Sequence, residues 1–116
     1  MSSVITLYGI KNCDSVKKSR KWLDKNSIRY VFHDFRLDGV KRKMIKEFLE
    51  NIEIELLINK RSTSWRKLSG REREMERKKD LIELLLNNPT IMKRPIIKTK
   101  NKYLVGFNEK ELKLLK

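Results

Sequence analysis

Two short apolar runs near the start of the chain flank a segment with helical spacing. Residues 4–8 are rich in β-branched and aromatic side chains and end at a glycine, which predicts a buried strand. Between residues 13 and 26, apolar or small residues recur every three or four positions, which predicts an amphipathic helix. Asn12 can cap this helix, because its side-chain oxygen can accept from free first-turn amides. Residues 30–35 predict a second strand, so the order predicts a parallel β-α-β unit.

The middle of the chain predicts helices. Residues 44–52 have a clear amphipathic pattern, and residues 81–86 belong to another helix that Asn87 to Pro89 close. Ser62 to Ser64 precede Trp65 like a helix start, with Trp65 packed on the core. The alternating basic and acidic residues within 60–79 predict a solvated helix that carries ion pairs, with a break at Ser69 and Gly70.

The end of the chain predicts a hairpin and a last helix. Residues 96–98 and 103–105 are two short apolar runs around a polar turn, which is typical of a β-hairpin. Asn108 followed three residues later by Glu111 is a capping-box pattern. The whole order, β-α-β, helices, then β-β-α, describes an α/β fold with a thioredoxin- or glutaredoxin-like mixed sheet. At 116 residues, we expect one domain over 1–116, with an inserted helical segment at about 38–88.

The chain is strongly basic. It has 29 lysines and arginines against 15 aspartates and glutamates, for a net charge of +14. This charge suits a nucleic acid, an acidic protein or an anionic small molecule, and it also suits a solvated surface without a ligand. No apolar run approaches the roughly 18 residues of a membrane span, and the first residues lack the features of a signal peptide. We therefore expect a cytoplasmic protein with no membrane partner.

Metal and disulfide chemistry are limited by the composition. One cysteine excludes an internal disulfide and a cysteine-based zinc site, and one histidine excludes histidine clusters. That histidine, His33, lies within a predicted strand, which favours a structural role. We expect no metal and no bound cofactor.

Cys13 is the first candidate for chemistry. It follows the first strand and opens the first helix, where unpaired amides and the helix dipole favour an anion. Lys11 and Lys17 lie close in sequence, so a thiol here ionises more readily, and the thiolate is the nucleophile. The alternative is a small buried apolar residue, the commonest role of a free cysteine.

Two arginines and a proline are the other candidates. Pro95 opens a predicted strand, and in a thioredoxin-like layout a cis-proline there faces the active thiol. Arg94 beside it suits an anion or a surface ion pair equally well. Arg61 lies among hydroxyls and cations at a helix start, a pattern that can bind an anion.

Three ordered motifs are similar to those of a known family. Residues 7–14 (LYGIKNCD), 65–68 (WRKL) and 91–95 (IMKRP) resemble the arsenate reductase-like (ArsC) family of the thioredoxin superfamily. The resemblance is greatest to its YffB-type reductases, which are related to the Spx and MgsR regulators, and it covers nearly the whole chain. It implies a glutaredoxin-like fold and a thiol reductase activity, with glutathione or another external thiol as co-substrate.

The resemblance also implies roles for individual residues. In related arsenate reductases the nucleophile matches Cys13, arginines matching Arg61 and Arg94 bind the oxyanion or its glutathione adduct, and the proline matching Pro95 is cis. A third anion-binding arginine falls at Gly106, which removes that contact. The full set of expected site residues is Cys13 as nucleophile, with Lys11, Asn12, Lys17, Arg61, Arg94 and Pro95 around the substrate.

The sequence is compatible with three functions. The leading hypothesis is a monomeric glutathione-dependent reductase of a small-molecule or protein disulfide, or of an oxyanion-type substrate. The alternative is a non-catalytic regulator that, like Spx, binds RNA polymerase. Such regulators often carry Cys-x-x-Cys, whereas the second position here is Val16, which excludes a disulfide switch. Nucleic-acid binding through charge alone is the least favoured of the three.

Overall fold

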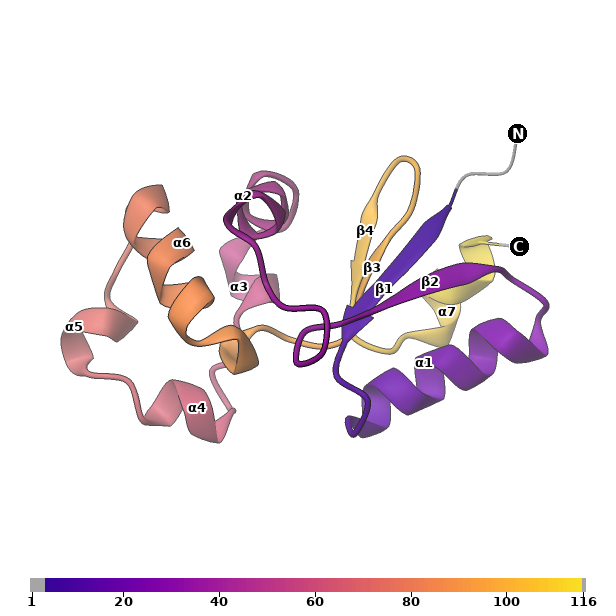
Figure 1. Ribbon diagram of the computed structural model, residues 1–116, viewed down its shortest axis with the longest axis horizontal. Helices are drawn as coiled ribbons and strands as arrows, with labels where there is room; N and C mark the ends of the chain where they lie inside the picture. Colours follow the sequence, from indigo (N-terminus) through magenta and orange to yellow (C-terminus); the bar gives the residue numbers. More distant parts are fainter. Residues whose placement is uncertain (1–3, 116) are drawn as a thin grey trace. The chain divides into compact units, whose positions relative to one another are not determined.

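The computed structural model describes residues 4–115, and these divide into two compact units. The first unit combines the residues up to Gly39 with those from Arg94 onward, and the second is Val40–Lys93. Figure 1 shows the sheet in the first unit and only helices with connecting loops in the second. That the whole chain is a single domain with an insertion at about 38–88 stays a prediction.

The first unit is built on a four-stranded sheet with the order β2-β1-β3-β4. β1 (Ile5–Gly9) pairs in parallel with β2 (Tyr30–Asp34), and α1 (Asp14–Lys25) connects them. β1 also pairs antiparallel with β3 (Ile96–Lys98), which forms a hairpin with β4 (Tyr103–Val105). The parallel β-α-β unit and the C-terminal hairpin are therefore confirmed.

One face of this sheet carries the core of the first unit. Leu7 of β1 pairs with Ile97 of β3, which pairs with Leu104 of β4, so these three side chains share a face. α1 and α7 (Glu109–Leu112) cover that face. The buried cluster consists of Ile5, Leu7, Val16, Leu23, Ile97, Leu104 and Leu112.

α7 begins at a side-chain cap. The Asn108 side chain accepts from the Glu111 N–H at 3.2 Å, as the sequence pattern predicts, and a 3₁₀ turn at Lys113–Leu115 follows. α1 has no such cap, because Cys13 and not Asn12 is its N-cap residue. The prediction that Asn12 caps the helix is wrong. The turn after β1 closes with the Cys13 N–H on the Ile10 carbonyl, which leaves Asn12 exposed and one residue too early to cap.

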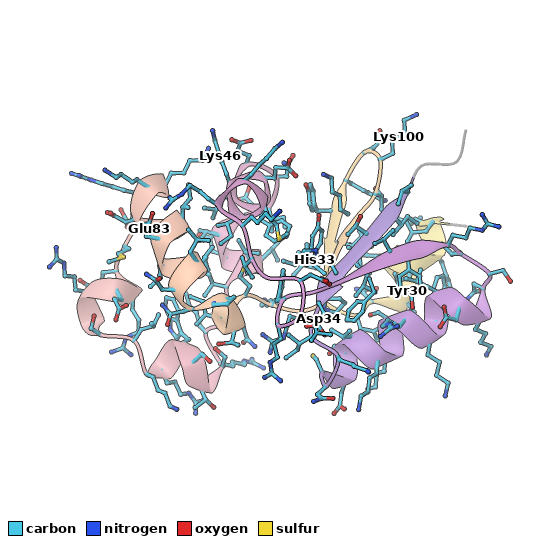
Figure 2. All side chains as sticks on the ribbon, in the orientation of Figure 1. Tyr30, His33, Asp34, Lys46, Glu83 and Lys100 are labelled. Carbon is cyan, nitrogen blue, oxygen red and sulfur yellow. The ribbon has the colours of Figure 1, made fainter. Side chains whose placement is uncertain are left out.

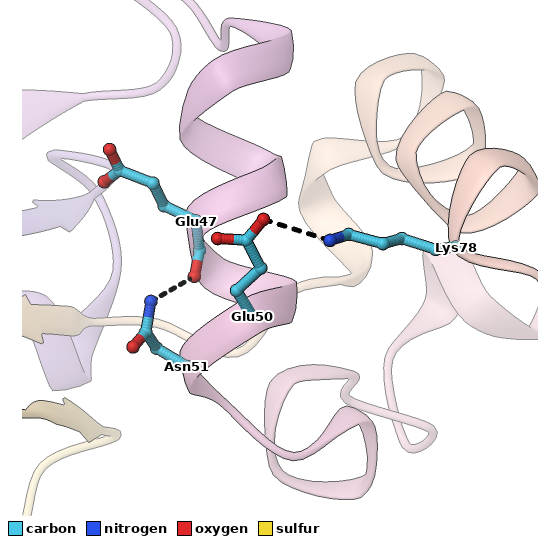
Figure 3. A network of polar contacts seen from close by, with 4 residues as sticks. All are labelled: Glu47, Glu50, Asn51 and Lys78. Carbon is cyan, nitrogen blue, oxygen red and sulfur yellow. Dashed lines mark hydrogen bonds and ion pairs between the residues drawn. The ribbon is translucent and has the colours of Figure 1, made fainter.

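The second unit contains five α-helices within Val40–Lys93: α2 (Arg42–Asn51), α3 (Ile54–Leu57), α4 (Thr63–Arg66), α5 (Gly70–Arg73) and α6 (Lys78–Asn87). A 3₁₀ turn at Pro89–Ile91 follows α6. α2 packs against α6, and a 3.0 Å ion pair between Lys78 and Glu50 and another between Arg42 and Glu83 join them. Figure 3 shows the first pair together with the Asn51 amide donating to the Glu47 carbonyl.

The segment 60–79 has a helix start before Trp65 and an interruption near Ser69, as predicted, but its helices are shorter than the charge pattern suggests. It contains two single-turn helices, α4 and α5, each opened by a serine cap. Ser69 does not only break a helix: it starts α5, with its hydroxyl accepting from the Glu72 N–H while the Glu72 carboxylate accepts from the Ser69 N–H. Glu72, which the charge pattern assigns to an ion pair, therefore caps the backbone. The two ion pairs given above join α2 to α6. Trp65 of α4 is half-buried, with the Lys60 ammonium 5.8 Å from its ring centre.

Candidate active site

The turn between β1 and α1 presents Cys13 at the N-terminus of the helix. Cys13 has an extended backbone (φ −96°, ψ 127°), and its carbonyl accepts from the Lys17 N–H at 2.9 Å. Within residues 4–115 its side chain makes no capping hydrogen bond to α1, and the residue is half-buried. The first-turn amides therefore have no capping oxygen, and they can stabilise negative charge on a sulfur or on a bound anion.

Gly9 sets how closely the first turn of α1 approaches the sheet. A Cβ atom at this position would lie 2.6 Å from Cγ2 of Val16, far inside van der Waals contact. Val16 is fully buried in the first turn of α1, three residues after Cys13. Gly9 therefore lets the helix that carries the thiol pack onto the end of β1. From the sequence, Gly9 marks only the end of a strand, and its place between a strand and a thiol-bearing turn is the signal for this close packing.

The cations near the thiol in sequence are at the surface. Lys11 lies in the turn and Lys17 in α1, and both side chains are exposed, as is Asn12. Exposed ammonium groups attract anions over a distance of about 8–10 Å at ordinary salt. These residues can therefore draw an anionic substrate toward the N-terminus of α1 without being buried by it.

The peptide bond between Arg94 and Pro95 is cis, as the resemblance implies. Pro95 is buried and its carbonyl accepts from the Gly106 N–H at 2.8 Å. The next residue, Ile96, pairs with Tyr8 of β1, so Pro95 lies at the end of the sheet from which the Cys13 turn leaves. Arg94 is half-buried beside it. The topology thus brings Lys11, Asn12, Cys13, Lys17, Arg94 and Pro95 to one end of the first unit's sheet.

Arg61 belongs to the second unit. It is exposed on the turn between α3 and α4, where its N–H donates to the Asn59 side-chain oxygen at 3.1 Å. Ser62, the next residue, caps α4 by accepting from the Trp65 N–H. The local structure therefore holds the backbone at Arg61 and leaves its guanidinium in solvent.

His33 and Asp34 hold the end of β2 (Figure 2). His33 Nε2 lies 2.8 Å from the Gly39 carbonyl oxygen, and its ring packs against Tyr8 with the ring centres 5.3 Å apart. The buried Asp34 carboxylate accepts from the Arg36 and Leu37 N–H groups. Both side chains make polar contacts with the backbone of the turn after β2, which agrees with a structural role for His33.

Clusters of metal ligands and membrane-spanning helices are both absent from residues 4–115. Within this range, no three or more histidine, cysteine, aspartate or glutamate side chains gather as a metal site would require. In the same range, no helix is both long enough and apolar enough to cross a membrane.

Comparison with known proteins decides the family. A model of the ArsC family matches residues 8–115. The chain belongs to the ArsC family. An uncharacterized protein of Haemophilus influenzae is 44% identical over 108 residues, which span 93% of this chain and 95% of that protein. The global transcriptional regulator Spx of Streptococcus agalactiae is 31% identical over 112 residues, which span 95% of this chain and 81% of Spx.

Solved structures of ArsC-type proteins have the same fold. A YffB protein matches with a TM-score of 0.88 at 33% identity, over 95% of this chain and 96% of that one. An arsenate reductase-related protein of Brucella melitensis matches with a TM-score of 0.76 at 37% identity, over 98% and 93%. The thioredoxin-like α/β fold is therefore confirmed, and this ArsC-family chain has the fold of an arsenate reductase-like thiol oxidoreductase.

Proposed function

We propose that this ArsC-family chain is a glutathione-dependent thiol reductase in which Cys13 is the nucleophile. The single observation that carries the proposal is the position of Cys13. It is the N-cap residue of α1, half-buried, with the first-turn amides uncapped and with Arg94 and Pro95 at the same end of the sheet. A thiol in such a place is activated by the helix terminus.

The proposed chemistry is thiol–disulfide exchange with a glutathione mixed disulfide. The Cys13 thiolate attacks the glutathione sulfur, a new S–S bond forms, and the substrate leaves as a thiolate that takes a proton from water. A second glutathione thiolate then attacks the glutathione sulfur of the adduct. The products are oxidised glutathione and the regenerated Cys13 thiolate. In the net reaction one free glutathione is consumed, and the substrate–glutathione disulfide is exchanged for the disulfide of oxidised glutathione, with the substrate released as a thiol.

The second step needs an external thiol, because the chain has a single cysteine. Glutathione suits the charges of this end of the sheet, since two carboxylates and one ammonium leave it net negative. We assign the attraction of its carboxylates to Lys11, Lys17 and Arg94. Arg61 belongs to the second unit, and we propose it as an anion-binding residue on the family resemblance alone. Asn12 and the backbone beside Pro95 contact the peptide-like part of the substrate in this proposal. An oxyanion-type substrate would use the same cations.

The test is to incubate the folded chain with oxidised glutathione and to measure intact mass over time. We expect one adduct per chain, release of the adduct by reduced glutathione, and no adduct on Cys13→Ser. We also expect iodoacetamide at pH 7 to alkylate the folded chain faster than the urea-unfolded chain, because only the fold supplies the helix terminus. A folded chain that forms no adduct, or that reacts more slowly than the unfolded one, would contradict the proposal.

A second candidate function is supported by the 31% identity with Spx over 95% of this chain. In this alternative the chain binds RNA polymerase without catalysis and works without a Cys-x-x-Cys switch, because position 16 is valine. Pull-down of purified polymerase by the wild-type chain and by Cys13→Ser separates the two. A regulator binds polymerase whether or not the thiol is present. A reductase no longer forms the glutathione adduct once Cys13→Ser has removed the thiol.

A reducing compartment is part of the leading proposal. A free nucleophilic thiol and a glutathione co-substrate suit the cytoplasm, where thiols are kept reduced. We propose that the protein works there as a monomer.

A further inference from the structure

A groove on the first unit lies between the outer side of α1 and the start of α7. We call it the Lys–Trp groove, and it is lined by Lys18, Lys21, Trp22, Lys25, Phe107 and Glu109. Trp22 and Phe107 are half-buried and pack against the core cluster from outside, so their remaining surface forms an apolar floor. The three lysines are exposed around this floor.

The stability of α1 does not explain Lys18 and Lys21. Lys18, Lys21 and Lys25 follow one another at spacings of three and four, so like charges are neighbours on one helix face. Such like-charge pairs destabilise a helix slightly. The helix dipole favours a cation only in the last turn, which accounts for Lys25 but not for Lys18 or Lys21. Between residues 4 and 115, no ion pair joins any of the three to a carboxylate.

We propose that the Lys–Trp groove docks an acidic segment of a partner protein through an aromatic or large aliphatic side chain. The apolar side chain of the partner covers Trp22 and Phe107, and its carboxylates pair with the three lysines. The net charge of +14 attracts an acidic partner from a distance, and the local lysines then orient it. Glu109 lies in the first turn of α7, where the helix terminus favours it, and it keeps the partner's carboxylates toward α1.

The shape of the site favours a protein over a nucleic acid. A nucleic acid strand needs a continuous track of cations along its phosphates, with aromatic platforms for its bases. The groove offers three lysines around an apolar floor, which fits a short segment with one anchoring side chain. The proposal does not depend on the thiol, because Cys13 does not line the groove.

The experiment uses the fluorescence of Trp22. The chain has two tryptophans, so Trp65→Phe makes Trp22 the single reporter. The probe is a synthetic twelve-residue peptide with four glutamates and one phenylalanine. We expect a saturable change in Trp22 emission that weakens as salt is raised, because screening shortens the reach of exposed charges. Cys13→Ser should bind the peptide equally well, which separates this proposal from the proposed reductase activity.

Two sets of variants decide whether the groove is the site. Lys18→Gln, Lys21→Gln and Lys25→Gln together should weaken binding by roughly tenfold or more, the combined effect expected of three exposed charges. Lys43→Gln, Lys46→Gln and Lys79→Gln remove the same charge from exposed positions of the second unit, and they should change binding much less. Equal weakening by both sets, or no saturable change, overturns the proposal. Tighter binding of an oligothymidine or of phosphatidylserine vesicles overturns the choice of an acidic protein.

Discussion

Gly9 is the residue on which the geometry of the thiol-bearing turn depends most directly. In Gly9→Ala the added methyl group would lie 2.6 Å from Cγ2 of Val16, so the buried Val16 side chain or the helix that carries it must shift. We expect the free energy of unfolding to fall by about 1–3 kcal/mol, the usual range for overpacking a tight core. Urea titration followed by circular dichroism measures it. Gly70→Ala is the matched control, because a Cβ there meets nothing within 4 Å and should change stability by less than about 1 kcal/mol. Equal losses in both variants would contradict this account.

Gly106 gives a backbone reason for one departure from the arsenate reductases. Its φ of +79° lies in the left-handed region, and its N–H donates to the Pro95 carbonyl. The resemblance puts the third anion-binding arginine of those enzymes at this position. An arginine here would pay the strain of a left-handed conformation, of order 1 kcal/mol. This turn is therefore shaped for glycine, and in the proposed reductase the anionic groups of the substrate are left to the remaining cations.

At the scale of elements, Asn108 caps α7 and Asn12 does not cap α1, so the two asparagines can be compared by substitution. Asn108→Ala removes the acceptor for the Glu111 N–H at the start of α7, and we expect a loss of about 1 kcal/mol in the free energy of unfolding. Asn12→Ala removes an exposed side chain that caps nothing in α1, and we expect a change within about 0.5 kcal/mol. Both are measured by urea unfolding. A loss at Asn12 as large as that at Asn108 would restore the capping role that the sequence suggests.

The elements that could be predicted are those with enough periodic residues. α1, α2 and the hairpin of β3 and β4 follow from helical spacing or from paired apolar runs. α4 and α5 have one turn each, and one turn is too short to show a helical period in the sequence. Only their capping serines indicate where these helices begin. The Ser69–Glu72 spacing is the signature of such a cap, although the adjacent Ser69 and Gly70 also predict a break.

The candidate site shows the same division between local and distant signals. A cysteine just after a strand and at the start of a helix pattern places Cys13 at the N-cap correctly. The cis bond before Pro95 came from the family resemblance, because X–Pro bonds in folded proteins are cis in only about 5–6% of cases. The contact of Gly9 with Val16 depends on how α1 packs, which no local pattern contains.

At the scale of the whole molecule, the chain leaves the first unit after Gly39 and returns to it at Arg94. The first unit is thus made of two segments that meet through β1 and β3. The second unit contains three helices of four residues, and helices this short do not form alone in water. A unit of this size also buries little apolar surface by itself. We therefore expect the two units to fold as one cooperative domain.

The two tryptophans make this expectation measurable, because Trp22 lies in the first unit and Trp65 in the second. Trp65→Phe reports unfolding of the first unit by fluorescence, and Trp22→Phe reports the second. For each variant, tryptophan fluorescence and circular dichroism are measured in the same urea titration. Circular dichroism reports the helices and strands of both units, so the comparison within one variant corrects for any stability change caused by the substitution. Coincident midpoints and slopes within each variant are expected of a single two-state domain. If fluorescence of Trp65 changes at lower urea than circular dichroism while Trp22 does not, the helical unit unfolds separately. The chain would then hold two folding units on one thioredoxin-like frame.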